Sequence, residues 1–102
     1  MRLKEGVRVV GIRPEMVLAL MVADSVYKSH GYDATLTSGV EGKHSETSLH
    51  YAGGAGDLRI NDLPQGVAPV IAADLGEALG EDFDVVLEET HIHIEFQPRQ
   101  LT

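Results

Sequence analysis

The sequence predicts an α+β domain in which two main helices pack on a small antiparallel sheet. Two segments repeat apolar residues at helical spacing, and five short segments are β-branched or alternate between apolar and polar residues, as strands do. The last two strand segments are separated by only three residues, a connection that requires antiparallel pairing. Interspersed helices and strands closed by such a hairpin are typical of the α+β class, and residues 1–102 fit a single domain.

The first strand and the first helix are expected in the N-terminal third. Val7–Ile12 is short, apolar and β-branched, which favours a strand or an extended lead-in. Pro14 suits the first turn of a helix and Glu15 suits the positive end of the helix dipole, so we expect a helix from Pro14 to about Ser29. His30 and Gly31 provide a C-terminal stop, and contact with the helix dipole accounts for that histidine. The buried stripe of this helix is expected to consist of Val17, Leu20, Met21 and Tyr27.

A strand, a long loop and a second strand are expected in the middle of the chain. Asp33–Ser38 alternates and is rich in threonine, which favours a strand. Residues 39–56 contain five glycines and show no sustained periodicity. A loop of this length inside a small domain is uncommon unless it has a function. Asp57–Ile60 then alternates as a half-buried strand does, with Asp57 and Arg59 on its polar face.

The C-terminal third is expected to form a helix followed by a hairpin. Apolar residues recur at helical spacing up to Gly80, at Val67, Val70, Ile71, Leu75, Ala78 and Leu79. Phe83–Leu87 and His91–Phe96 are expected strands. Glu88–Thr90 between them is expected to be a bulge or a tight turn.

Composition excludes several classes of protein. Eight Lys and Arg residues against sixteen Asp and Glu residues give a net charge of −8, which has the wrong sign for a surface that tracks nucleic acid phosphates. The absence of cysteine excludes a disulfide framework, a thiolate zinc site and a cysteine nucleophile.

The chain is expected to be soluble and to bind no membrane. Its longest uncharged apolar run, Met16–Ala23, is eight residues long, well short of the roughly 20 that a membrane helix needs. Glu5 and Glu15 interrupt the basic N-terminal region that a signal peptide requires, so we expect the protein to be cytoplasmic as synthesised. Its site of action, inside the cell, after release by lysis or on a virion, stays open.

Two groups of residues suggest a metal site. Histidines separated by one residue on a strand point the same way, so His91 and His93 present two imidazoles on one face. By itself this pattern is more often an exposed polar strand. In the long loop, His50 and Asp57 are seven residues apart across three glycines, which allow the backbone to fold tightly. Two histidines and an aspartate can hold a catalytic zinc ion and leave its fourth position open, although the glycine-rich stretch alone is as often a flexible surface loop.

These groups carry a resemblance to a known family. The string S-x-H-x-x-G-x-A-x-D is matched in full, by Ser48, His50, Gly53, Ala55 and Asp57. It resembles the zinc-binding signature of the D-alanyl-D-alanine carboxypeptidase and dipeptidase family. The downstream Glu88-x-x-His91-x-His93 resembles the second signature of the same group, whose fold is shared by Hedgehog signalling domains and lysostaphin-type endopeptidases. The resemblance is to short phage or prophage versions and spans roughly Gly31 to Pro98.

The resemblance implies a zinc peptidase, a carboxypeptidase or endopeptidase, that cleaves peptidoglycan-derived peptides next to a D-amino acid. His50, Asp57 and His93 would be the zinc ligands, Glu88 the general base and His91 a second active-site histidine. In the dipeptidase branch the ligand would instead be His91, three residues after the glutamate. The later histidine is favoured because the His-x-His pattern is present.

Several assignments stay open at this point. Ser48 either touches substrate or caps its loop. Arg59 either holds a substrate carboxylate or pairs with a neighbouring glutamate, and His44 is treated as a loop residue. Strict strand alternation would place Glu89 rather than Glu88 on the face of the histidines, unless a turn reverses the count. Oligomeric state is not predicted.

Two other functions compete with the peptidase. One is a catalytically silent recognition module of the same fold, in which zinc contributes stability alone. The other is an acidic protein whose histidines have no common role. Retention of the acidic Glu88 favours the enzyme weakly.

Overall fold

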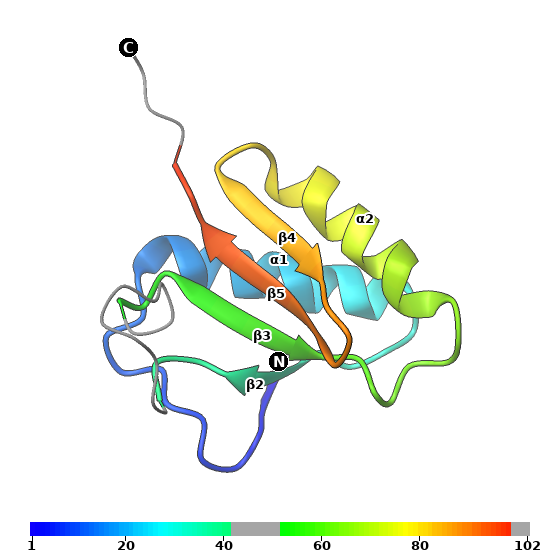
Figure 1. Ribbon diagram of the computed structural model, residues 1–102, viewed down its shortest axis with the longest axis horizontal. Helices are drawn as coiled ribbons and strands as arrows, with labels where there is room; N and C mark the ends of the chain where they lie inside the picture. The colour runs from blue at the N-terminus through cyan, green and yellow to red at the C-terminus, as the bar shows by residue number, and fades with distance from the viewer. Residues whose placement is uncertain (42–51, 99–102) are drawn as a thin grey trace.

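The structure is a computed structural model that describes residues 1–41 and 52–98. In chain order, its elements are β1 (Arg2–Leu3), α1 (Pro14–Ser29), β2 (Thr35–Ser38), β3 (Ala55–Arg59), α2 (Val67–Leu79), β4 (Phe83–Leu87) and β5 (His91–Phe96). The strands form one five-stranded sheet in the order β1-β2-β3-β5-β4; in the view of Figure 1, α1 lies behind the sheet and α2 lies alongside β4. This arrangement confirms the predicted α+β class.

The sheet is mixed, so the prediction of an antiparallel sheet is wrong at one edge. The pairs β2–β3, β3–β5 and β5–β4 are antiparallel, whereas β1 runs parallel to β2. The chain passes from β1 to β2 through α1. A connection through a helix returns the chain to the same end of the sheet, which is what parallel pairing requires.

The predicted strand at Val7–Ile12 is an irregular segment instead. Gly6 and Gly11 flank most of it and have positive φ values of 90° and 84°, a conformation that interrupts an extended strand. Val7, Val9 and Ile12 of this segment still pack against the core, whereas Val10 is exposed. The edge of the sheet is formed by β1, because the amide of Arg2 donates to the carbonyl of Ala34 at 2.8 Å and continues the pairing of β2.

Both helices begin and end as predicted. α1 has a proline in its first turn and is followed by Gly31, whose φ of 86° stops the helix, and α2 ends before Gly80. The predicted stripe of α1 is wrong in part, because Val17 and Met21 are 45% and 62% exposed. The residues that α1 buries are Met16, Ala19, Leu20, Ala23 and Tyr27. Apolar residues lie on nearly every side of this helix, so their spacing does not define the buried face.

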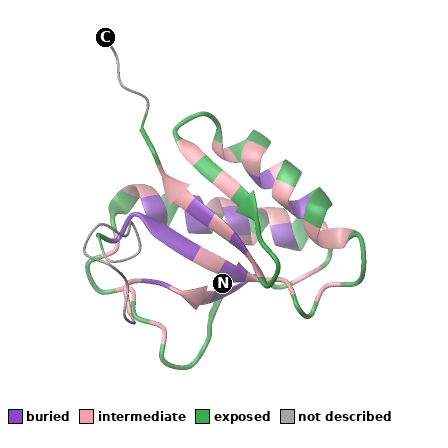
Figure 2. Ribbon diagram, viewed as in Figure 1, coloured by how far each residue is buried: buried purple, intermediate pink, exposed green. Residues whose placement is uncertain are grey.

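The core lies between the helices and one face of the sheet (Figure 2). Every second residue of the central strands enters it, and the register places Leu58 opposite Ile92 and Gly56 opposite Ile94. The alternate residues face away from the helices. Within the two ranges that the structure covers, no helix combines the length and the apolar character needed to cross a membrane.

The hydroxyl of Tyr27 ties α1 to the end of β3. This side chain is fully buried, and its hydroxyl donates a 3.0 Å hydrogen bond to the carbonyl of Arg59. Burial, together with the nearby charge of Asp62, raises the pKa of the Tyr27 phenol, so the phenol stays protonated and remains a donor. This contact fixes the position of the strand that carries Asp57.

We expect Tyr27→Phe to lower the free energy of unfolding by about 1 kcal/mol, because the buried hydrogen bond is lost while the ring packing is kept. Urea unfolding measured by circular dichroism gives the value. Tyr32→Phe is the matched control, since the Tyr32 hydroxyl has no hydrogen bond to the residues described here. Equal losses in the two variants would contradict a specific role for the Tyr27 contact.

Candidate metal centre

The pairing of β3 with β5 brings predicted site residues together. The register places Asp57 opposite His93 and Arg59 opposite His91. Opposed residues of an antiparallel pair point to the same side of the sheet, so these four side chains share one face. It is the face turned away from the two helices.

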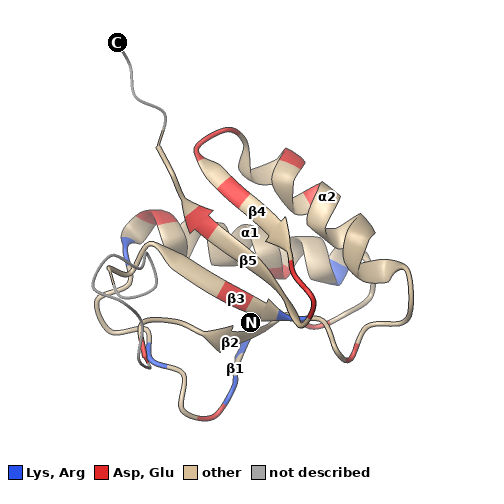
Figure 3. Ribbon diagram, in the orientation of Figure 1, with Lys and Arg blue, Asp and Glu red and all other residues tan. Residues whose placement is uncertain are grey.

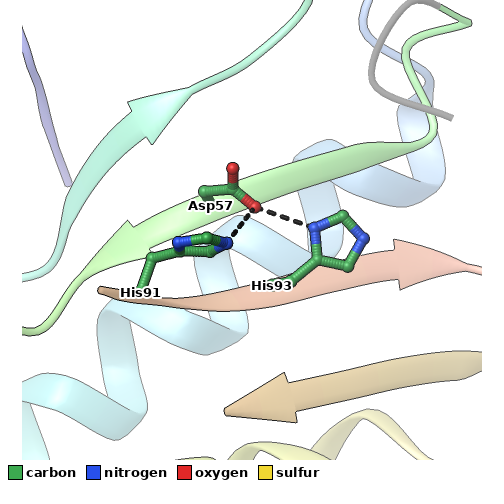
Figure 4. A group of neighbouring side chains, drawn as sticks. All are labelled: Asp57, His91 and His93. Carbon is green, nitrogen blue, oxygen red and sulfur yellow. Dashed lines mark hydrogen bonds and ion pairs between the residues drawn. The ribbon is translucent and has the colours of Figure 1, made fainter. Parts of the chain in front are cut away.

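The carboxylate of Asp57 lies between the two imidazole rings (Figure 4). Asp57 Oδ1 is 2.8 Å from His93 Nδ1 and 3.6 Å from His91 Nε2. The side chains are 15%, 16% and 25% exposed for Asp57, His93 and His91. The His91 ring is oriented by Thr90, whose hydroxyl oxygen is 2.9 Å from His91 Nδ1. The three residues therefore form a half-buried group with one side open to solvent.

The hairpin turn between β4 and β5 places Glu88 beside this group. The amide of Glu88 donates to the carbonyl of His91 at 2.8 Å, so the two residues stand opposite each other across a turn formed by Glu89 and Thr90. Glu88 Oε2 is 3.7 Å from His91 Nε2. Alternation counted straight along the chain would put Glu89 on the face of His91. The chain reverses direction between them, and Glu88 takes that position instead.

Two carboxylates surround the ring of His93. Its Nδ1 contacts Asp57 at 2.8 Å and its Nε2 contacts Glu95 Oε1 at 2.9 Å. The hydrogen bond with Asp57 raises the pKa of His93 to about 9, against the opposing effect of burial, and Glu95 raises it further. In the absence of a metal ion the ring is therefore a cation at neutral pH.

The three residues can hold a metal ion. One ligand atom from each of Asp57, His91 and His93 lies within 4.8 Å of the other two. Ligand atoms of a tetrahedral zinc site are about 3.3 Å apart, since each bond is about 2.0–2.1 Å long. The observed separations of 2.8 and 3.6 Å fall on either side of that value. Two imidazoles and one carboxylate are also a donor set that zinc accepts.

The other predicted site residues have different outcomes. Ser48, His50 and His44 lie outside the described residues. Arg59 shares the face of Asp57, as expected, but the predicted alternative of an ion pair with a glutamate is not observed within residues 1–41 and 52–98. His30 lies far from the site along the chain, where its Nε2 contacts Asp74 of α2 at 2.6 Å.

Two residues near the centre were not predicted as functional. Glu95 lies two residues after His93, so strand alternation was enough to place it on the same face. Thr90 contacts His91 through a turn, and no periodic pattern indicates that contact.

Comparison with known proteins finds no match, since no family model, no curated protein and no solved structure is similar enough to the chain to count as one. The resemblance to zinc peptidases rests on the two sequence motifs.

We expect the His93 ring to titrate near pH 9 in chelator-treated protein and Asp57→Asn to move its midpoint back toward 6.5, because the carboxylate stabilises the imidazolium. The folded-state pKa lies above the ordinary value of 6.5. This interaction therefore stabilises the metal-free fold fully below about pH 6.5, and the stabilisation is lost as pH rises through about 9. Nuclear magnetic resonance titration of the ring signals measures the midpoint.

Among the described residues, Asp57 and Glu95 contact the His93 ring, and His91 lies across Asp57 from it. The ring signals of His30 serve as the control, because that residue contacts Asp74 and should be unaffected by Asp57→Asn. An unchanged His93 midpoint in Asp57→Asn would show that the hydrogen bond is not its cause.

Proposed function

We propose that the protein is a zinc-dependent peptidase that hydrolyses bonds next to a D-amino acid in peptidoglycan-derived peptides. The observation that carries this proposal is the group formed by Asp57, His91 and His93, with Glu88 at its edge. A metal site beside an acidic residue suits hydrolysis in general. The order and spacing of the same residues resemble those of the D-alanyl-D-alanine carboxypeptidases, which supports this substrate class.

The proposed zinc ligands are Asp57 and His93, with His50 from the first motif as the third. His91 is the second active-site histidine and lies beside Asp57 and His93. Its Nδ1 is in contact with the hydroxyl of Thr90, and its Nε2 is the atom directed at Asp57.

In this proposal, zinc, Glu88 and His91 have separate roles in peptide hydrolysis. A bound zinc ion supplies Lewis-acid chemistry, acidifying a water molecule and polarising the carbonyl that the water attacks. Glu88 accepts the proton of that water and passes it to the leaving amine. Its side chain is 49% exposed and reaches the site from a turn, which gives it room for both steps. His91 Nε2 donates a hydrogen bond to the oxygen that becomes negative.

The charge of the surrounding surface favours small substrates. Acidic residues mark β3, β4, β5 and the hairpin turn around the centre (Figure 3). With a net charge of −8, the protein repels anionic wall polymers at long range. Soluble muropeptides and peptides that end in D-Ala-D-Ala are therefore better substrates in this proposal than intact walls.

Metal analysis of the purified protein should find about one zinc ion per chain, as a three-ligand site predicts. His50→Ala, Asp57→Ala and His93→Ala should each abolish zinc binding, because each removes a ligand. His30→Ala is the matched control, since it removes a histidine of the helical layer that contacts Asp74. Protein that is folded but zinc-free after purification without chelator would exclude the proposal.

Glu88→Gln should leave the zinc content unchanged and lower the turnover of D-Ala-D-Ala-ended peptides by on the order of 100-fold, because the general base is lost. Glu89→Gln, one residue further into the turn, should leave turnover nearly unchanged. Release of D-alanine measures both variants. The opposite result, with Glu89→Gln inactive and Glu88→Gln active, would transfer the role of base to Glu89.

A zinc-stabilised recognition module is the second candidate, and one observation favours it. The metal-binding residues link β3 to β5, the two strands that hold the centre of the sheet together, so a metal ion there would also stabilise the fold. Stoichiometric zinc, a large loss of stability on chelation and no turnover of any D-amino acid peptide would favour this module over the peptidase.

A further inference from the structure

A cavity of about 500 Å³ lies at one end of the sheet, where Arg59 of β3 is one of its lining residues. It forms where the edge strands β1 and β2 and the end of β3 meet the loops that follow α1 and β3. Residues that line it include Arg2, Lys4, Tyr32, Thr35, Arg59 and Leu63. Arg59 relates the cavity to the site, because it lines the cavity and stands opposite His91 on the same face of the sheet.

The guanidinium of Arg59 has no acidic partner within the described ranges, although its residue is half-buried. Half-buried cations are usually paired, because a charge that loses water needs a compensating group. The carbonyl of Arg59 is held by the hydroxyl of Tyr27 at 3.0 Å, so the backbone that carries the guanidinium is fixed. The cavity thus contains a hydrogen-bond donor, the Arg59 guanidinium, that is held in position and has no carboxylate partner among the described residues.

The other charged residues that line the cavity are exposed to solvent. Arg2 pairs with Asp33 at 3.2 Å, and Lys4, Glu5 and Asp62 are exposed to solvent. Three cations and three acids therefore line the cavity and balance each other, whereas the whole chain has a net charge of −8. An anionic ligand is repelled less here than over the rest of the protein.

We propose that this cavity is a carboxylate subsite, in which Arg59 binds a carboxylate of the peptide substrate and Lys4 assists. A guanidinium matches a carboxylate through two parallel hydrogen bonds. Asp57 and Arg59 are two residues apart on β3, or about 7 Å along the strand. That is the length of two extended residues, so the carboxylate belongs within two residues of the bond that is cleaved. The substrate class is an acidic peptide, and its identification as a substrate rests on the proposed peptidase function.

Binding is tested first without catalysis, on the metal-free full chain. The three probes are N-acetyl-D-Ala-D-Ala, its C-terminal amide, and the same amide with D-Glu as its last residue. Binding of each probe is measured from the changes in the nuclear magnetic resonance signals of the protein. The free acid should bind about tenfold more tightly than the first amide, and its binding should shift the resonance signals of Arg59. Arg59→Gln should remove the tenfold difference in affinity. Arg8→Gln, which removes an exposed cation outside the cavity, is the matched control.

The D-Glu amide identifies the source of the carboxylate. Tight binding of this amide supports a side-chain carboxylate, and tight binding of the free acid alone supports the chain end. Equal affinity for all three probes, or a preference for the acid that survives Arg59→Gln, would overturn the subsite.

Turnover by the zinc-loaded protein separates the subsite from the peptidase proposal. Arg59→Gln should raise KM for the acidic peptide about tenfold and change kcat little, because Arg59 holds the substrate away from the reacting bond. Binding that depends on Arg59 without any turnover would retain the subsite and reject the peptidase. Turnover with the same KM in Arg59→Gln and wild type would retain the peptidase and reject the subsite.

Discussion

The antiparallel pairing of β3 with β5 is the contact on which both the core and the candidate centre depend. One register places Leu58 opposite Ile92 toward the helices and Asp57 opposite His93 on the other side. A slip of one residue would turn the apolar set outward and move the polar group into the core. Burial of apolar side chains therefore determines the geometry of the polar group, and the same hydrophobic contacts that stabilise the sheet also align Asp57 with the histidines.

Elements that depend on local sequence were predictable, and those that depend on distant contacts were not. Pro14 and Gly31 define the limits of α1 through backbone geometry, and the short connection of β4 to β5 allows only a hairpin. The parallel pairing of β1 depends on a partner more than thirty residues away, as its register with Thr35 shows. The exposed side of α1 was equally difficult, because Met21 is as apolar as the residues that the helix buries.

The polar group was predictable for a related reason. Alternation within a strand is local, so the common face of His91 and His93 follows from the sequence alone. Their proximity to Asp57 required the resemblance of two motifs to a known family, since spacing along the chain does not determine which strands pair. The cavity beside Arg59 had no sequence signal, because five separate segments line it. The residues that share one face of a strand can be predicted from the alternation in the sequence. The residues that line a cavity can be identified only when the fold is known.

The position of β5 in the sheet differs from its position in the chain. It follows β3 and β4 in the sequence, yet it lies between them in the sheet, and Asp57 and His93 are 36 residues apart. Until β5 enters, β3 has an open edge and the polar group contains only its aspartate. The hairpin of β4 and β5 therefore supplies both the second partner of β3 and the two histidines. The polar group of Asp57, His91 and His93 is therefore complete only when β5 has entered the sheet.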